Sequence, residues 1–228
     1  NINYKAHVSA LFNGRGSIYG GEREKDWIIC NGNYQLSLSK SDNCVKLRNY
    51  NTKEDRVFFL FPRIGLPYTT EFSKKRAEDV EFIEEDHSIL MKVYYIPQNS
   101  NLRVISYLRL YPDGLLENYY EIQNNGELQT NNEILIARGV FFSLVNAILP
   151  YDGEIIELKS SENIEWENWN LGLLSENWLF SSYEGISSGI CWPLSANLIY
   201  NGWHFLVEEN LGKISGKGHK STGSIYLF

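Results

Sequence analysis

The sequence predicts an all-β fold, a large antiparallel β-sandwich of two packed sheets with little helix. From residue 26 to residue 228, short segments alternate apolar and polar residues with a period of two, which places every second side chain on the same face of a strand. The chain holds 15 Tyr and 11 Phe, and both residue types pack well on a pleated surface. No long segment carries the apolar period of a helix.

The N-terminal part of the chain contains short strands joined by turns. Strands are predicted over residues 4–12, 26–30, 34–38, 45–48 and 56–61. The next segments lack this alternation. We therefore predict a loop over residues 62–67, and residues 70–77 are the one charged stretch that could form a short helix.

The rest of the chain continues the pattern. Strands are predicted over residues 80–85, 89–96, 102–111, 115–123, 134–145, 154–158, 178–182, 186–192, 198–208 and 221–228, with a long polar loop over 160–174. Short turns between consecutive strands imply an antiparallel meander. So many strands exceed one open sheet, which predicts two packed sheets.

No linker of Pro, Gly or Ser composition divides the chain, so we predict one domain over residues 1–228. The chain does not begin with Met, and its last residues have the pattern of a strand. We therefore expect a domain cut from a longer protein, with neighbouring domains of the parent chain as partners.

Composition argues against several classes of protein. The net charge of -7 would repel a phosphate backbone, so we expect no nucleic-acid partner. No apolar run approaches the ~20 residues of a membrane span, so we expect no membrane partner. Cys30, Cys44 and Cys191 cannot all pair and have no zinc-ligand spacing, which predicts free thiols without a zinc site or a disulfide framework. We also expect no metal site and no cofactor.

The sharpest local signal is the segment Tyr111-Pro112-Asp113-Gly114-Leu115. Pro suits the first position of a turn, and Gly suits a following left-handed position. These residues predict a three-residue hairpin loop in which Tyr111 faces Leu115. The same register places Arg109 opposite Glu117, Tyr107 opposite Tyr119, Ile105 opposite Glu121 and Arg103 opposite Gln123.

One face of this hairpin is therefore polar and aromatic, and the other is apolar. The candidate binding residues on the polar face are Arg103, Tyr107, Arg109, Glu117, Tyr119 and Glu121. Aromatic rings pack against sugar rings, and Arg and Glu bond hydroxyl groups, so this face suits a carbohydrate. The alternative is a solvated outer face whose cross-strand pairs contribute about 0.2–1 kcal/mol each.

Tryptophans and histidines offer weaker candidates. Trp166, Trp169 and Trp178 lie in or beside an acidic loop, where their rings could stack on a ligand or cover the end of a sheet. The four histidines are scattered, and none has a carboxylate that the sequence places within reach, which favours structural roles. We therefore predict no catalytic residues.

Several segments resemble galactose-mutarotase-like domains. The segment at residues 117–126 ends in Asn124-Asn125-Gly126, and residues 189–193, 203–208 and 216–228 are similar to the closing strands of that fold, where a Gly-rich turn precedes the last strand. The resemblance implies a β-supersandwich with a concave binding face. Enzymes of that family use a His and a carboxylate to open and close a sugar ring, and no such pair can be assigned here from the sequence.

These observations lead us to expect a non-catalytic accessory module of a larger protein that binds a carbohydrate. Two alternatives stay open. The first is a sugar-active enzyme of the mutarotase, epimerase or lyase type, which needs a His within reach of a carboxylate. The second is a structural packing domain, which needs a large exposed apolar patch.

Overall fold

The computed structural model describes residues 18–58, 60, 62–64, 77–96, 101–142, 146–158, 168–169, 174, 176–183, 185–200 and 204–228. Within these ranges all regular structure is strand, which confirms the predicted all-β class. No helix able to cross a membrane occurs among them. The strand predicted over residues 4–12 lies outside the described residues, as does the possible helix over 70–77 except for Ala77.

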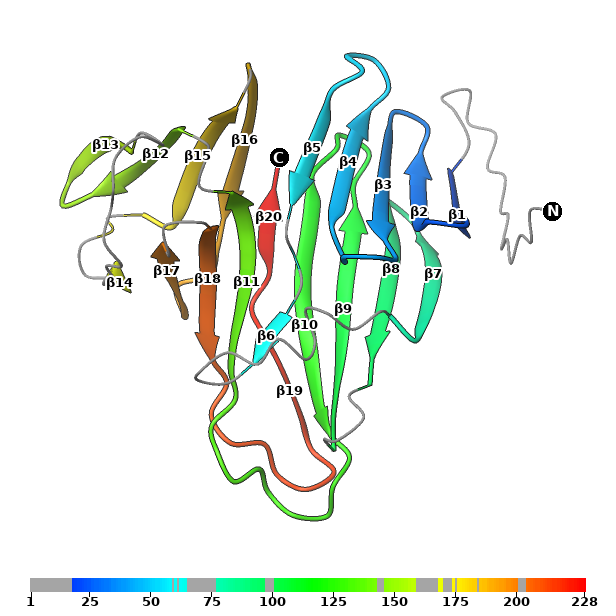
Figure 1. Cartoon of the computed structure of the whole chain (residues 1–228), viewed down its shortest axis with the longest axis vertical. Coiled ribbons are helices and arrows are strands. Elements are labelled where there is room, and N and C mark those ends of the chain that lie inside the picture. Colours follow the sequence, from blue (N-terminus) through cyan, green and yellow to red (C-terminus); the bar gives the residue numbers. More distant parts are fainter. Residues whose placement is uncertain are drawn as a thin grey trace.

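A ten-stranded antiparallel sheet forms one layer of the sandwich (Figure 1). Its order is β13-β12-β15-β16-β20-β10-β9-β8-β7, and β19 also pairs with β10. The bounds are β7 Asp79–Glu85, β8 Ser88–Tyr95, β9 Leu102–Leu110, β10 Leu116–Asn124, β12 Asn146–Tyr151, β13 Glu154–Leu158, β15 Trp178–Tyr183, β16 Ile186–Cys191, β19 His219–Ser221 and β20 Ile225–Leu227. The meander predicted from short turns is the run β7 to β10.

Two five-stranded sheets lie side by side across the ten-stranded sheet (Figure 1). The first is a meander of β1 Ile18–Glu22, β2 Asp26–Asn31, β3 Tyr34–Ser39, β4 Val45–Asn49 and β5 Asp55–Phe58. The second has the order β14-β17-β18-β11-β6, with β6 Pro62–Ile64, β11 Leu135–Phe142, β14 Asn168–Trp169, β17 Ala196–Tyr200 and β18 His204–Asn210. The predicted sandwich is thus confirmed, with one of its layers divided into two sheets.

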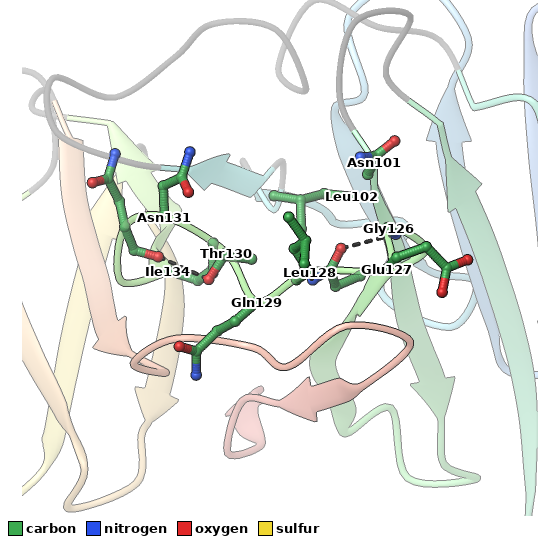
Figure 2. Close-up of a pocket in the computed structure, with 11 residues that line it drawn as sticks. Asn101, Leu102, Gly126, Glu127, Leu128, Gln129, Thr130, Asn131 and Ile134 are labelled. Carbon is green, nitrogen blue, oxygen red and sulfur yellow. Dashed lines mark hydrogen bonds between the residues drawn. The ribbon is translucent and has the colours of Figure 1, made fainter.

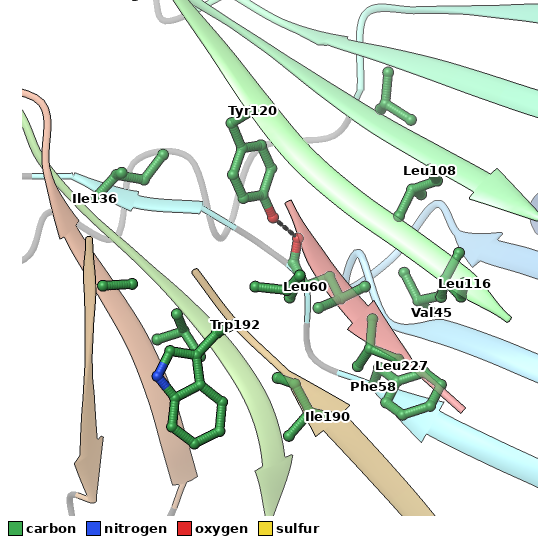
Figure 3. Packing of buried hydrophobic residues seen from close by; sticks show 14 of the residues in the cluster. Val45, Phe58, Leu60, Leu108, Leu116, Tyr120, Ile136, Ile190, Trp192 and Leu227 are labelled. Carbon is green, nitrogen blue, oxygen red and sulfur yellow. Dashed lines mark hydrogen bonds between the residues drawn. The ribbon is translucent and has the colours of Figure 1, made fainter. Parts of the chain in front are cut away.

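The core fills the space between the layers, because the alternation of each strand directs its apolar side chains inward. Leu108 of β9 and Leu116 of β10 meet Val45 and Phe58 of the first small sheet, while Ile136 comes from the second (Figure 3). All three sheets therefore share one apolar cluster.

Tyr120 connects the ten-stranded sheet to the segment between the two small sheets (Figure 3). It lies on β10 and is fully buried, and its hydroxyl donates to the carbonyl of Leu60, between β5 and β6. A buried Tyr hydroxyl needs such a partner. This bond anchors the crossing of the chain from one small sheet to the other.

The prediction of a loop over residues 62–67 is wrong for its first three residues, which form the edge strand β6. Pro62 begins this strand and pairs with Arg138 of β11. A proline lacks the N–H that a central strand needs, but an edge strand tolerates it at its first position. The sequence pattern gave no sign of the partner strand.

Some strand boundaries were also wrong. The strand predicted over residues 198–208 is two strands, β17 and β18, which pair antiparallel with Tyr200 opposite Phe205. Between them the sequence has Asn201-Gly202, a dipeptide typical of hairpin turns. The strand predicted over 134–145 is β11 as far as Phe142, and residues 143–145 lie outside the described residues. Strands β1, β12 and β14 were not predicted.

Candidate functional site

The predicted hairpin at Tyr111–Leu115 is confirmed. The Tyr111 amide donates to the Leu115 carbonyl at 2.9 Å, and the Gly114 amide donates to the Tyr111 carbonyl at 3.0 Å. Gly114 has a φ of 91°, the left-handed conformation that favours glycine. The turn therefore sets the register of β9 against β10.

That register is also as predicted. The facing pairs are Arg103 with Gln123, Ile105 with Glu121, Tyr107 with Tyr119, and Arg109 with Glu117. The six candidate residues lie together on one face, because their neighbours Leu108, Leu110 and Leu116 point into the core. We call this side of the ten-stranded sheet, turned away from the two small sheets, the outer face. That the six residues bind a ligand stays a prediction.

Glu117 is the centre of a hydrogen-bonded group, the carboxylate cluster, formed by Glu85, Arg109, Tyr111, Glu117, Ser224 and Tyr226. Its Oε1 accepts from Ser224 Oγ at 2.5 Å and from the Tyr226 hydroxyl at 3.4 Å. Its Oε2 accepts from Arg109 and from the Tyr111 hydroxyl at 3.1 Å. A carboxylate has about four acceptor positions, so these donors satisfy Glu117 and hold its neighbours in place.

Arg109 joins two carboxylates. Its Nε and Nη2 donate to Glu85 at 2.7 and 3.1 Å, a bidentate pair, and its Nη1 donates to Glu117. Hydrogen bonding from Arg109 lowers the pKa of Glu85. Burial by itself would raise the pKa of Glu117, but hydrogen bonds from Ser224 and Arg109 outweigh it, so this pKa is lowered as well.

Replacing Glu117 with Gln should make the protein less stable at pH 7 by about 2 kcal/mol, because the charged hydrogen bonds are lost. A lowered pKa in the folded state adds stability that is present above the usual pKa of 4.5 and disappears as the pH falls through the lowered value. Urea unfolding of both proteins at pH 7 and in steps below pH 4.5 measures this. The difference should shrink with acid, whereas Glu24→Gln at an exposed turn should change little at any pH.

Tyr107 and Tyr119 form a stacked pair beside the carboxylate cluster. Their ring centroids are 4.4 Å apart and the planes differ by 8°. Lys92 covers the other side of Tyr107 at 5.5 Å, and the Tyr107 hydroxyl donates to Glu121 at 3.2 Å. Burial, followed by the Glu121 charge, raises the pKa of Tyr107. Since the two tyrosines face each other across β9 and β10, the second face of Tyr119 is turned toward β20.

Arg103 is separated from the carboxylate cluster. Its guanidinium lies 4.5 Å from the ring centroid of Tyr94 on β8, a cation–π contact. The structure thus brings Arg109, Glu117, Tyr107, Tyr119 and Glu121 together and places Arg103 at the far end of the same face.

The sequence reasoning missed Glu85, Tyr111, Ser224 and Tyr226 as parts of the cluster. The pairing of β10 with β20 places Tyr226 opposite Glu117, although the two residues are 109 positions apart. Periodicity shows which side of a strand a residue occupies, but it does not show which distant strand lies next to it. No signal in the sequence pointed to Glu85, Ser224 or Tyr226, whereas the predicted hairpin register already placed Tyr111 on this face.

A second aromatic group lies further along the outer face, and we call Trp178, Phe180 and Phe228 the aromatic cluster. Phe180 contacts Trp178 and Phe228 edge to face, with centroids 5.8 and 5.5 Å apart. Phe180 is 42% exposed and Phe228 is 40% exposed. Trp178 lies on a strand, as predicted, whereas Trp166 and the side chain of Trp169 lie outside the described residues.

The structure also contains a pocket of about 620 Å³, lined mainly by the segment that follows β10 (Figure 2). None of the six candidate residues lines it. Its wall is held by Asn124, whose amide donates to the carbonyls of Leu128, Ile214 and Ser215. The Asn-x-Gly segment noted in the sequence therefore fastens the chain after β10 to the chain after β18.

The residues that the structure describes contain no group of His, Cys, Asp and Glu suited to a metal ion. The three cysteines are free thiols, as predicted. His87 and His219 are both exposed. His7 and the side chain of His204 lie outside the described residues.

No protein-family model matches this chain. No curated protein sequence matches it either.

Solved structures identify the fold. The whole chain is similar to a galactose mutarotase-like protein from Clostridium acetobutylicum, covering 98% of that chain with a TM-score of 0.55 and 9% identity. It is also similar to one from Lactobacillus casei, with 89% of this chain and 100% of that chain covered, a TM-score of 0.53 and 10% identity. The chain therefore has a galactose-mutarotase-like fold, as the resemblance implied.

A third similar structure is a TPR-domain containing protein from Parabacteroides distasonis. The whole chain aligns with it at a TM-score of 0.63 and 6% identity. The chain spans 52% of the length of that protein. This fold thus also occurs as part of a longer chain.

Proposed function

We propose that the protein is a non-catalytic carbohydrate-binding module of a larger protein and that it binds its ligand on the outer face of the ten-stranded sheet. The observation that carries the proposal is the carboxylate cluster beside Tyr119. Tyr119 offers an aromatic ring face, and the cluster holds the Tyr111, Ser224 and Tyr226 hydroxyls at set positions. A sugar has both apolar ring faces and hydroxyl groups, so it matches both features.

The fold supports the proposal in a coarser way. Galactose mutarotase-like proteins share it, which makes a sugar-related function the natural class. The similarity to about half of a longer protein supports a role as one module among several. In this proposal Arg109, Tyr107, Tyr119 and Glu121 contact the ligand, and Glu117 orders them.

Replacing Tyr119 with Ala should weaken carbohydrate binding by about tenfold or more, equivalent to ~1.4 kcal/mol, because the ring face is lost. A titration of tryptophan fluorescence with a panel of mono- and oligosaccharides measures the binding. Tyr119→Phe should keep most of the affinity, since it keeps the ring. Tyr50→Ala is the matched control, because Tyr50 is a 41% exposed tyrosine beyond β4 of the first small sheet.

Unchanged affinity in Tyr119→Ala would contradict this binding site. Turnover of a sugar by the wild-type protein would favour the enzyme alternative, and it is measured by the change in optical rotation of freshly dissolved monosaccharides. A flat fluorescence response to every saccharide would favour the structural packing domain. The exposed side chains of Phe180 and Ile155 would then form part of its contact surface.

A further inference from the structure

The two clusters on the outer face are parts of one continuous row of side chains. Trp178 of β15 lies opposite Cys191 of β16, Cys191 lies opposite Tyr226 of β20, and Tyr226 lies opposite Glu117 of β10. Residues that face each other in antiparallel strands project to the same side of the sheet. Tyr226 joins the clusters, because it is 38% exposed and its hydroxyl donates to Glu117.

The row is longer than one sugar. Three spacings between neighbouring strands separate β15 from β10, which amounts to about 14 Å. A single monosaccharide ring cannot contact Trp178 and Glu117 at once. We propose that the ligand is an oligosaccharide that lies across the strands, with one unit at Tyr119 and the carboxylate cluster and another on the aromatic cluster. This inference rests on the proposed function and specifies its ligand.

The aromatic cluster is built to hold its rings in place. A Cβ at Gly189 of β16 would lie 2.3 Å from Cε2 of Phe228. The Phe228 ring therefore packs directly on the β16 backbone, in the space that the missing side chain leaves. The backbones of Gly189 and Phe228 exchange hydrogen bonds of 2.7 and 3.1 Å. The edge of the Phe180 ring then packs on Phe228 at 78°. Rings fixed before binding lose little conformational freedom when a ligand arrives.

The side chains between the two clusters suit the middle of such a chain. On its outer face β16 carries only Ser187, Gly189 and Cys191, which are all small. Next to them β20 presents the Tyr226 hydroxyl, and Ser224 precedes that strand. This alternation of ring faces and hydroxyl groups matches an oligosaccharide, which presents both kinds of surface along its length.

Isothermal titration calorimetry tests the inference. The ligands are α-1,4- and β-1,4-linked gluco-oligosaccharides and β-1,4-linked galacto-oligosaccharides, and each series runs from the monosaccharide to the hexasaccharide. Affinity in the preferred series should rise by about tenfold or more between the monosaccharide and the trisaccharide. Phe180→Ala should abolish this rise and leave the monosaccharide affinity within about twofold. Leu194→Ala is the control, because Leu194 is an 84% exposed apolar residue in the turn after β16.

Gly189→Ala is a second variant, because it displaces the Phe228 ring without removing any aromatic group. This variant should also reduce the rise in affinity from the monosaccharide to the trisaccharide. Circular dichroism melting of each variant shows whether the fold is retained.

Equal affinity for mono- and oligosaccharides, unchanged in Phe180→Ala, would overturn the oligosaccharide inference and leave the proposed function standing. Failure of every saccharide to bind would overturn both. A dimer in light scattering that Phe180→Ala dissociates would mean that a second copy of the chain covers the aromatic cluster, which also overturns the inference.

Discussion

Replacing Arg138 with Met should lower the free energy of unfolding by about 3–5 kcal/mol, because it leaves the carboxylate of Glu209 buried without its cation. Arg138 is 0% exposed and Glu209 is 6% exposed. The guanidinium donates to Glu209 at 3.1 Å and to the carbonyls of Asn118 and Gly223 at 3.1 and 3.0 Å. These bonds connect β11, β18, β10 and the segment before β20, so the loss affects both layers.

The electrostatics of this pair explain the size of the effect. Burial lowers the pKa of Arg138, while Tyr120 and the Glu209 carboxylate oppose that change. Glu209 also accepts from the Gly223 amide at 3.0 Å and from Ser195 at 2.9 Å. A loss of this size is a large fraction of the total stability of about 5–15 kcal/mol that is typical of a domain.

Urea unfolding followed by tryptophan fluorescence measures the Arg138 effect. The matched control is the double variant Arg138→Met with Glu209→Gln, which removes the unpaired charge and keeps an acceptor for Gly223. It should be more stable than Arg138→Met alone. If the single variant is as stable as the double one, the unpaired charge of Glu209 is not the cause of the lost stability.

Replacing Gly216 with Ala should cost about 1–3 kcal/mol or more, because the new methyl group has no room. Its Cβ would lie 1.9 Å from the carbonyl oxygen of Glu127 and 2.4 Å from the carbonyl carbon. Both are backbone atoms of the segment after β10, so a side-chain rotation cannot relieve the clash. Where the segment after β10 crosses the segment after β18, the Lys217 amide donates to the Gly126 carbonyl at 2.9 Å. This hydrogen bond should weaken as well.

The control for Gly216 is Gly21→Ala on β1, where a Cβ would meet nothing within 4 Å. Thermal unfolding should show a clear drop in the melting temperature for Gly216→Ala and little change for Gly21→Ala. Equal melting temperatures would show that the crossing of the two segments can move apart at low cost.

The resemblance noted in the sequence has a structural basis in this crossing. Asn124 donates to two carbonyls across it, those of Ile214 and Ser215, and Gly216 allows the two segments to approach. The residues that carried the resemblance therefore hold the fold together. This agrees with a chain that shares the galactose-mutarotase-like fold at only 9% and 10% identity with two solved structures.

Local patterns predicted well what depends on neighbouring residues. The alternation along β9 and β10 and the Tyr111–Leu115 turn were enough to place Arg109 opposite Glu117 and Tyr107 opposite Tyr119. They also separated the core side chains of this hairpin from those of the outer face. Local patterns failed where an edge strand begins with Pro62 and where the apolar run over 198–208 concealed a hairpin.

The sequence by itself determined the all-β class, the hairpin and its polar face, because side-chain direction in a strand follows from a period of two and a turn sets its own register. Only the tertiary structure decided which groups surround Glu117. Ser224 lies 107 residues from Glu117 along the chain, and Phe228, which follows β20, covers Gly189 of β16. The physical reason is that pairing between distant strands depends on the packing of the whole core, which no local pattern contains.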